Sequence, residues 1–514
     1  MKTISVEQMR KLDKDTIEKH GIEGKILMFR AAEKLSETII DFTSSLDLKH
    51  VKRVVFLAGK GNNGGDAYAA AGILREKLNI PIVIFSIVPI SEISGDALYY
   101  AKKLNGVIKI EEFKTLKNDD FKKGDIIIDG LLGTGFSGKL RENYKNWIST
   151  VNQSNLPVIS IDIPSGLNGD TGICEEEAIT ADITVTMGFP KKGLVLNDGL
   201  AKTGRIVVAD IGFPETLSNL IVNDISCFSE SDALEFLGRV VPTAHKKTFG
   251  SVLVIGGSDK YNGAPILSGY AALKSGCGFV TIAVPKSSGV QSIDKDSLIL
   301  SHVNDSSKGY FSKESIPQLI ELASKHDVIV IGPGMSQNEE TASIIEPLLA
   351  LNKTTIIDAD ALNLISKQTS LLKKRADLIF TPHPGEAKRL ANAFQVNEED
   401  NRIDFAKLLV KKTNGIMVLK GHRTIIANEN HLPCVNISGT PLLATAGSGD
   451  LLSGMIAASL ANKSVDKEIF EKVYFAVYMH GLLGEISEYK LRGITADELI
   501  KLIPLAAKKI SPFR

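Results

Sequence analysis

The sequence predicts an α/β protein with two three-layer αβα domains, each a mostly parallel sheet covered by helices on both faces. Three observations support this prediction. Short apolar runs typical of buried strands alternate with helical stretches in both halves of the chain. Glycine-rich loops follow several of these runs. The 514 residues are too many for one hydrophobic core, so at least two domains are expected.

The composition is that of a globular protein, with 43% hydrophobic and 23% charged residues. The 60 basic and 60 acidic residues cancel, so the whole chain has no net attraction for nucleic acid or an anionic membrane. No apolar run reaches the length of a membrane span, and the polar residues 1–5 are not a signal peptide. The four cysteines lie far apart and form neither a zinc pattern nor an evident disulfide framework, which favours the reducing cytoplasm.

The first half opens with two predicted helices. Ser5 and Gln8 fit a capping box that starts the first helix, and the second covers roughly 25–44. Strand-like runs follow, mostly separated by helical stretches, at 51–58, 81–88, 125–129, 157–162, 182–187 and 205–209. Because ligands bind beyond the carboxyl ends of such strands, the residues after each strand are the candidate site.

Several of these post-strand segments suggest chemistry. The segment 59–66 has four glycines and two asparagines, so it can expose backbone amides to a phosphate or dinucleotide. A second glycine-rich loop, 130–139, follows Asp129, and Asp162 ends another strand. Two carboxylates with nearby oxygens could bind a hard cation, or each could cap the next element. Lys191 is either a solvated lysine or an active-site lysine.

The segments 60–66, 129–135 and 160–166 closely resemble the NAD(P)H-hydrate epimerase domain, also called the YjeF N-terminal domain. The resemblance covers about residues 1–213. It implies a Rossmann-like domain, assigned to 1–218, that interconverts the R and S forms of hydrated NADH and NADPH (NADHX and NADPHX). The implied substrate contacts are Asn62, Asn63, Gly64, Gly65, Asp66, Gly133, Thr134, Gly135, Phe136, Ser137, Gly138, Lys139 and Asp162. The implied ligands of a potassium ion are Asn63, Asp129 and Ser165. Asp162 and Lys191 are the acid and base candidates.

The pattern lapses between 212 and 241, which places the domain boundary near 214–223. Further strands are predicted at 252–255, 279–284, 328–331, 355–358, 378–380 and 416–419. The segments that follow them are rich in glycine, proline or acidic residues, and we expect them to face one crevice.

The stretch 445–454 organises the second half. Gly447, Ser448 and Gly449 precede Asp450 and an apolar helical run, 451–460, which predicts a tight turn that opens a helix. Free N–H groups at such a helix start attract anions. Asp450 could then accept a hydroxyl proton as a phosphoryl group arrives, or it could merely cap the helix.

A second candidate segment surrounds His383, which lies between two prolines after a strand. The stiff backbone favours contact with a ligand. Glu386 either reaches a magnesium ion through water or only stabilises a helix N-terminus.

This half resembles the ADP-dependent NAD(P)H-hydrate dehydratase of the ribokinase-like superfamily, over roughly 226–509. The segments that carry the resemblance are 262–265, 332–334, 358–363, 381–386, 420–424 and 447–454. It implies a ribokinase-like domain, assigned to 226–510. There ADP with Mg²⁺ phosphorylates the hydroxyl of the S hydrate, and phosphate then leaves to restore NAD(P)H, with Asp450 as the base. The implied hydrate contacts are Ala264, Gly334, His383 and Asp450, and the implied nucleotide contacts are Lys420, Gly421, His422, Arg423, Thr424 and Gly449.

The favoured function is therefore a bifunctional repair enzyme for hydrated nicotinamide nucleotides. The alternative is a ribokinase-like kinase for a small alcohol, such as a vitamin precursor, fused to a nucleotide-binding scaffold. The intact segment 62–66 together with Asp129 and Asp162 favours catalysis in the first half. Expected partners are NADHX, NADPHX and ADP, in a cytoplasmic homo-oligomer without nucleic acid or membrane partners. The sequence itself does not separate ADP from ATP.

Overall fold

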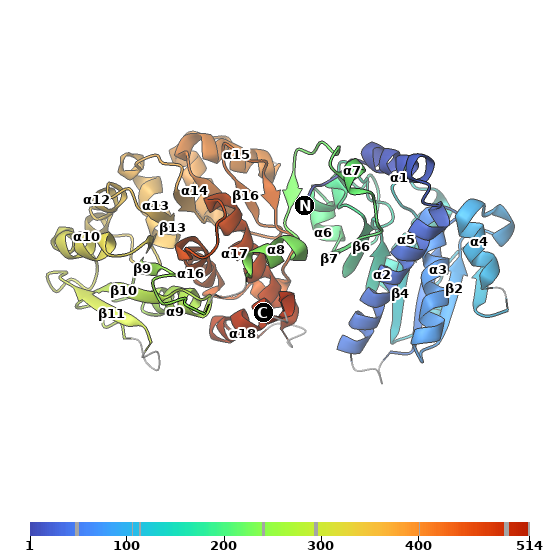
Figure 1. Ribbon diagram of the computed structural model, residues 1–514, viewed down its shortest axis with the longest axis horizontal. Helices are drawn as coiled ribbons and strands as arrows, with labels where there is room; N and C mark the ends of the chain where they lie inside the picture. Colours follow the sequence, from blue (N-terminus) through green and yellow to red (C-terminus); the bar gives the residue numbers. More distant parts are fainter. Residues whose placement is uncertain are drawn as a thin grey trace. The chain divides into compact units, whose positions relative to one another are not determined.

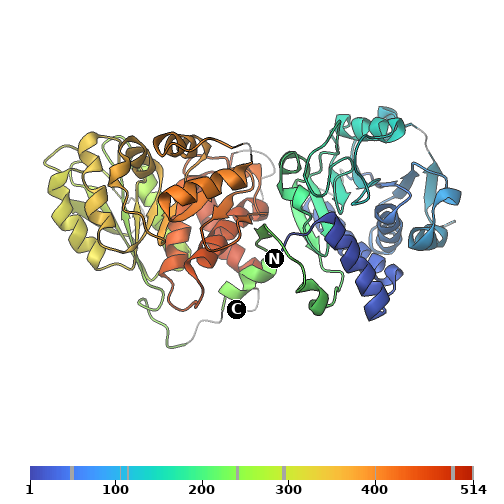
Figure 2. The same cartoon turned by 90° about the horizontal axis from the view of Figure 1, so that it is seen from above.

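The computed structural model describes residues 1–46, 51–104, 106–112, 115–238, 242–291, 297–399, 401–487 and 493–511. The chain divides into two compact units, Met1–Ile225 and Ser226–Arg514. Each unit contains one sheet with helices on both faces (Figure 1, Figure 2), so the predicted α/β fold class is confirmed. Within the described ranges, no helix is long and apolar enough to cross a membrane. The four cysteines lie within the described ranges and form no disulfide bond.

The first unit is built on a seven-stranded sheet of order β3-β2-β1-β4-β5-β6-β7, in which every pair is parallel. The strands are β1 (Arg53–Ala58), β2 (Ile82–Ser86), β3 (Lys109–Glu112), β4 (Asp125–Gly130), β5 (Val158–Ile161), β6 (Ile183–Met187) and β7 (Arg205–Ala209). The strand order reverses between β1 and β4, which opens a crevice at their carboxyl ends.

The helices of this unit are α1 (Val6–His20), α2 (Gly24–Ser45), α3 (Asn62–Lys77), α4 (Gly95–Lys103), α5 (Glu142–Gln153), α6 (Gly199–Lys202) and α7 (Glu215–Ser218). The predicted capping box at Ser5 and Gln8 is confirmed. Side chains of β1 alternate between two apolar cores, because successive strand residues face opposite sides of a sheet. Phe56 packs with α2, α3 and α4, whereas Leu57 packs with α5.

The loop within the segment 59–66 is shorter than predicted: helix α3 already begins at Asn62. This early start is possible because the first turn of the helix packs closely against the loop. A Cβ atom built on Gly64 would lie 2.0 Å from the carbonyl oxygen of Gly59. Glycine at position 64 therefore allows the helix to start directly against the end of β1.

The second unit has a ten-stranded sheet of order β11-β10-β9-β12-β13-β14-β15-β16-β17-β8. The strands are β8 (Ser226–Cys227), β9 (Ser251–Ile255), β10 (Phe279–Pro285), β11 (Ile299–Val303), β12 (Val328–Ile331), β13 (Thr354–Ile357), β14 (Leu378–Phe380), β15 (Ile416–Leu419), β16 (Ile425–Ala427) and β17 (Cys434–Val435). The pairs β15–β16 and β16–β17 are antiparallel, and the other pairs are parallel.

The helices of this unit are α8 (Glu230–Phe236), α9 (Gly263–Lys274), α10 (Ile316–Ser324), α11 (Glu339–Ala342), α12 (Ile345–Leu349), α13 (Ala359–Lys367), α14 (Pro384–Ala393), α15 (Arg402–Thr413), α16 (Ser448–Ala461), α17 (Ile469–Ile486) and α18 (Ala496–Ile510). Helices α9, α16, α17 and α18 share one apolar core with the sheet, and α10, α12, α13, α14 and α15 lie on its other side (Figure 1). A Cβ atom on Gly454 would lie 2.0 Å from the Ser268 oxygen. Helix α16 is thus held close against α9.

Candidate active sites

In the first unit, a cavity of about 590 Å³ lies at the carboxyl ends of β1 and β4. The predicted residues that line it are Asn62, Asn63, Gly133, Thr134, Gly135, Phe136, Ser137 and Lys139. Helix α1 adds Arg10 and Asp13, and Arg10 donates to the Thr134 carbonyl over 3.0 Å. Sequence reasoning missed both residues, since no glycine loop or strand end marks them.

The other predicted substrate contacts, Gly64, Gly65, Asp66, Gly138 and Asp162, are not among the described residues that line this cavity. Gly64 and Gly65 both lie in close packing contacts. A Cβ atom on Gly65 would lie 2.5 Å from the Met28 methyl group. Asp66 is buried, and burial raises its pKa well above the ordinary value, an effect that the negative charge of Asp162 increases.

Asp129 lies at the end of β4 in a buried hydrogen-bonded cluster. Its carboxylate accepts from the Ser165 hydroxyl over 2.6 Å, from the Ser165 N–H over 2.9 Å and from the Ser160 hydroxyl over 2.9 Å. The Asn63 side-chain amide donates to the carbonyls of Leu132 (3.0 Å) and Ile161 (2.6 Å). Burial raises the pKa of Asp129, and the hydrogen bonds from Ser165 and Ser160 counteract part of that rise. The three predicted potassium ligands thus come from the first turn of α3 (Asn63), the end of β4 (Asp129) and the loop after β5 (Ser165), and both Asn63 and Ser165 donate to the Leu132 carbonyl.

Lys191 is not a surface lysine: its side chain is fully buried. The ammonium group is bonded to the Asp162 carboxylate and also donates to the Met187 carbonyl over 2.9 Å. Asp162 has a left-handed backbone with φ 64°. Lys191 contacts one oxygen of the Asp162 carboxylate, Oδ1, which also accepts from the Met187 N–H over 3.0 Å. Burial raises the pKa of Asp13 to about 6, the charge of Lys191 lowers it and that of Asp162 raises it.

In the second unit, the predicted turn at the start of α16 is confirmed. Gly447 is the N-cap with φ 84°, and the helix begins at Ser448. Gly449 and Asp450 therefore lie in the first helical turn. The Nε2 atom of His480 lies 3.0 Å from the Ser448 carbonyl oxygen, and burial lowers the pKa of His480 to about 4, which keeps the ring neutral. Sequence reasoning missed this residue, because its contact depends on the packing of α17.

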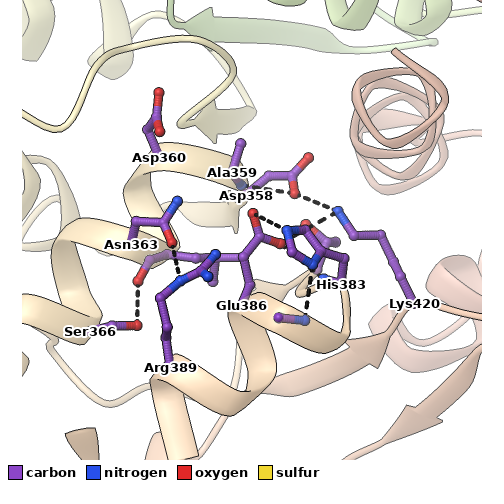
Figure 3. A network of polar contacts seen from close by, with 12 residues as sticks. Asp358, Ala359, Asp360, Asn363, Ser366, His383, Glu386, Arg389 and Lys420 are labelled. Carbon is purple, nitrogen blue, oxygen red and sulfur yellow. Dashed lines mark hydrogen bonds and ion pairs between the residues drawn. The ribbon is translucent and has the colours of Figure 1, made fainter. Parts of the chain in front are cut away.

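Lys420, directly after β15, lies between two acidic side chains, Asp358 after β13 and Glu386 in α14 (Figure 3). Its ammonium group donates to Asp358 over 3.0 Å and lies 4.0 Å from Glu386. Glu386 accepts from the His383 N–H over 2.9 Å in the capping box of α14. A Cβ atom on Gly449 would lie 3.3 Å from Lys420 Nζ, so the ammonium group faces the start of α16.

Asp450 shares the electrostatic environment of this network. Burial raises its pKa to about 8, with a further rise from the negative charge of Asp358 and a decrease from Lys420. Burial also raises the pKa of Glu386 and lowers that of His383. The acidic side chain at the helix start is therefore mostly neutral at pH 7 before any ligand binds.

A cavity of about 530 Å³ adjoins these groups. Its lining includes all six predicted nucleotide contacts, namely Lys420, Gly421, His422, Arg423, Thr424 and Gly449, together with His383. The Arg423 side chain is buried and donates to the Ile437 carbonyl over 2.7 Å, which directs the guanidinium group into the protein.

Ala264, in the first turn of α9, lies close to Gly334, in the loop after β12. A Cβ atom on Gly334 would lie 2.8 Å from the Cβ atom of Tyr261 and 3.4 Å from that of Ala264. Neither these two residues nor Asp450 is among the described residues that line the 530 Å³ cavity. Asp360 connects the two regions, since it accepts from the Ser336 N–H over 3.0 Å and raises the pKa of Asp450.

Comparison with known proteins identifies both halves. The model of the YjeF-related protein N-terminus matches residues 24–193, and the model described as NAD(P)H-hydrate dehydratase matches residues 252–505. An ADP/ATP-dependent NAD(P)H-hydrate dehydratase from Bacillus subtilis, co-crystallised with ATP and Mg²⁺, is 26% identical with a TM-score of 0.45, covering 56% of this chain and 100% of that one. A ribokinase-like superfamily protein from Enterococcus faecalis is 27% identical with a TM-score of 0.47, covering 57% and 98%.

Relatives of full length are also similar. The bifunctional NAD(P)H-hydrate repair enzyme Nnr of Archaeoglobus fulgidus is 32% identical over 518 residues, covering 100% of both chains. The enzyme of the same name from Moorella thermoacetica is 30% identical over 527 residues, covering 99% of this chain and 97% of the relative. The chain belongs to the family of bifunctional NAD(P)H-hydrate repair enzymes.

Proposed function

We propose that this chain repairs hydrated nicotinamide nucleotides in two reactions. The first unit interconverts the R and S forms of NADHX and NADPHX. The second unit dehydrates the S form with ADP, which yields NAD(P)H, AMP and phosphate. Family membership over the whole chain supports both reactions. The observation that carries the dehydratase proposal is Asp450 in the first turn of α16, beside Lys420.

Dehydration requires that hydroxide, a poor leaving group, becomes a good one. Asp450 accepts the proton of the substrate hydroxyl group. The oxygen of that hydroxyl group attacks the terminal phosphorus of ADP, and AMP leaves. The C–O bond of the phosphorylated hydrate then breaks, phosphate leaves with the electron pair, and loss of a ring proton restores the double bond. The amides at the start of α16 stabilise the negative charge on the transferring group.

Mg²⁺ would enter this site with the nucleotide. Over the described residues, no group of three or more His, Cys, Asp or Glu side chains is arranged to hold a metal ion. Mg²⁺ is commonly bound through phosphates, water and only one or two carboxylates. Glu386 and Asp358 are the carboxylates that fit this part, and the ion would neutralise charge on the phosphates.

Epimerisation inverts the hydroxyl-bearing carbon, so a bond at that carbon must break and form again. Such a step needs a group that donates a proton and a group that takes it back. The paired Asp162 and Lys191 supply a carboxylate and an ammonium group in direct contact. Asp13 brings a further carboxyl group to the cavity, with its pKa raised to about 6 by burial.

A potassium ion fits the cluster at the end of β4. The side chains of Asn63, Asp129 and Ser165 offer oxygen ligands, which suit a hard cation. Among the described residues, the buried Asp129 carboxylate accepts hydrogen bonds from neutral hydroxyl and N–H groups, so a monovalent cation would offset its charge. When bound, the ion would supply a fixed positive charge beside the nucleotide cavity.

A cytoplasmic location and a homo-oligomeric state remain predictions.

A single assay tests both reactions. A mixture of R and S NADHX is incubated with the protein and ADP, and the absorbance of the reduced ring is followed. We expect complete conversion to NADH. Conversion that stops at the S fraction would contradict the epimerase assignment, and no conversion with either ADP or ATP would contradict the dehydratase assignment.

A further inference from the structure

The side chain of Arg402 is hydrogen-bonded to the backbone of the turn between β15 and β16. Arg402, the first residue of α15, donates through Nη2 to the carbonyls of Leu419 (3.3 Å) and Lys420 (3.2 Å). Its Nη1 donates to the carbonyls of His422 and Arg423, the latter over 3.4 Å. A planar guanidinium group with fixed donors can gather several carbonyls in this way. Arg402 therefore attaches the turn to the start of α15 through four carbonyl groups.

Gly421 is the residue that lets the guanidinium group approach. Its φ of 140° lies in the region that favours glycine, and a Cβ atom there would lie 2.9 Å from Arg402 Nη2. The residues 420–424 all line the 530 Å³ cavity, whereas Arg402 is not among the described lining residues. The turn thus separates Arg402 from the cavity.

The direction of the peptide groups follows from these contacts. In a trans peptide the C=O and N–H groups point in opposite directions, and the described chain has no cis peptide bond. The carbonyls of Lys420 and Arg423 point to Arg402, so the N–H groups of Gly421 and Thr424 point away from it. Backbone N–H groups that converge on a cavity suit the oxygens of a phosphate group.

We propose that Arg402 is a positioning residue for nucleotide binding. By holding four carbonyls of the turn, it presents the N–H groups of Gly421 and Thr424 to a phosphate group of the nucleoside diphosphate. This proposal rests on the proposed function of the second unit, because it requires a nucleotide at residues 420–424.

Arg402→Met tests the proposal, because methionine keeps the aliphatic stem and removes the donors. We expect the KM for ADP in dehydration, and the Kd for ADP from calorimetry, to rise at least about tenfold, since several hydrogen-bonded contacts depend on the turn. We expect kcat and the KM for the S hydrate to change less than about threefold. Arg402→Lys keeps a positive charge, so its KM and Kd for ADP should lie between those of the wild type and Arg402→Met. The lysine variant also replaces the methionine variant in the test if the latter does not fold.

Arg375→Met is the matched control. Arg375 also donates to two carbonyls, those of Leu349 and Lys353, but it lies just before β14, at the amino-terminal ends of the strands, whereas the turn held by Arg402 follows the carboxyl end of β15. We expect a lower melting temperature and an unchanged KM for ADP. An Arg402 variant with wild-type affinity for ADP would overturn the proposal, as would an equal loss of affinity in the Arg375 variant. A wild type that binds ADP without dehydrating the hydrate would contradict only the proposed function. A wild type that does not bind ADP would contradict both.

Discussion

At the scale of single residues, Asp450 shows how the fold prepares a base. Burial and the charge of Asp358 raise its pKa to about 8, while Lys420 limits the rise. A carboxylate with an ordinary pKa is a weak base at neutral pH, and proton transfer is most efficient when the pKa lies near the working pH. Burial and the acidic neighbours therefore increase the basicity of the group that we propose as the acceptor of the hydroxyl proton.

We expect kcat/KM for dehydration to rise with pH and to level off above about 8, because only ionised Asp450 accepts a proton. Asp450→Asn should lower kcat at least about 10²-fold while interconversion of the R and S forms persists. Initial rates between pH 6 and pH 9 check this expectation.

Asp360→Asn removes a charge that raises the pKa of Asp450, so the increase of kcat/KM with pH should occur at lower pH in this variant. A flat profile in the wild type would contradict the assignment of the base.

The same pKa predicts a stability difference that needs no substrate. The folded pKa of about 8 lies above the ordinary value of 3.8, so ionisation of Asp450 opposes folding. The folded protein therefore favours the protonated form of Asp450. The stability that this preference contributes is fully present below the unfolded pKa and is lost as the pH rises through the folded pKa. Above pH 8, Asp450→Asn should therefore melt at a higher temperature than the wild type, by a larger margin than at pH 6.

At the scale of secondary-structure elements, helix α16, which carries the base that we propose, is held in position by α9. The two helices meet where Gly454 lies against the Ser268 carbonyl. Any side chain at 454 would push α16 away from α9. Since Asp450 lies one turn earlier on the same helix, the position of the base depends on this packing contact.

We expect Gly454→Ala to destabilise the second unit by about 1–3 kcal/mol, the usual cost of an overpacked core contact, and to lower kcat for dehydration. The Cβ atom would lie 2.0 Å from the Ser268 oxygen, so the backbone must move. Urea unfolding and the hydrate assay give the two measurements. Gly263→Ala, at the first position of α9, is the control, because a Cβ atom there has no neighbour within 4 Å. Equal effects of the two substitutions would contradict the packing argument.

The elements also show how much the sequence could predict. Every strand predicted from an apolar run exists, because a strand buried on both faces of a parallel sheet reads as continuous apolar sequence. The strand β3 was missed, since Lys-Ile-Glu-Glu at a sheet edge has no such run. The strands β8 and β17 have two residues each and form only through their neighbours.

The candidate sites divide in the same way. Glycine loops and acidic strand ends are local patterns, so Asn63, Asp129, Lys420 and Asp450 could be proposed from sequence. Asp13 and Arg402 lie on helices whose local sequence resembles that of any charged surface helix. Their positions depend on how α1 and α15 pack against distant strand ends, which no short pattern reports.

At the scale of the whole molecule, each unit has its own sheet, its own apolar core and its own candidate site. The residues that we assign to epimerisation all precede Ile225, and those assigned to dehydration all follow Ser226. The R hydrate must nevertheless pass through both sites before it becomes NAD(P)H, so the two activities are linked by their shared substrate.

Two inactive variants should therefore complement each other in a mixture. Asp162→Asn keeps a residue that tolerates the left-handed backbone at φ 64° but removes the carboxylate, and Asp450→Asn removes the other base. From a mixture of R and S NADHX with ADP, we expect Asp162→Asn alone to convert only the S fraction and Asp450→Asn alone to yield no NADH. Both variants together should convert everything, faster than the spontaneous epimerisation measured without Asp450→Asn. A mixture that stops at the S fraction would show that the two reactions need one intact chain, because a released S hydrate would otherwise reach the second protein by diffusion.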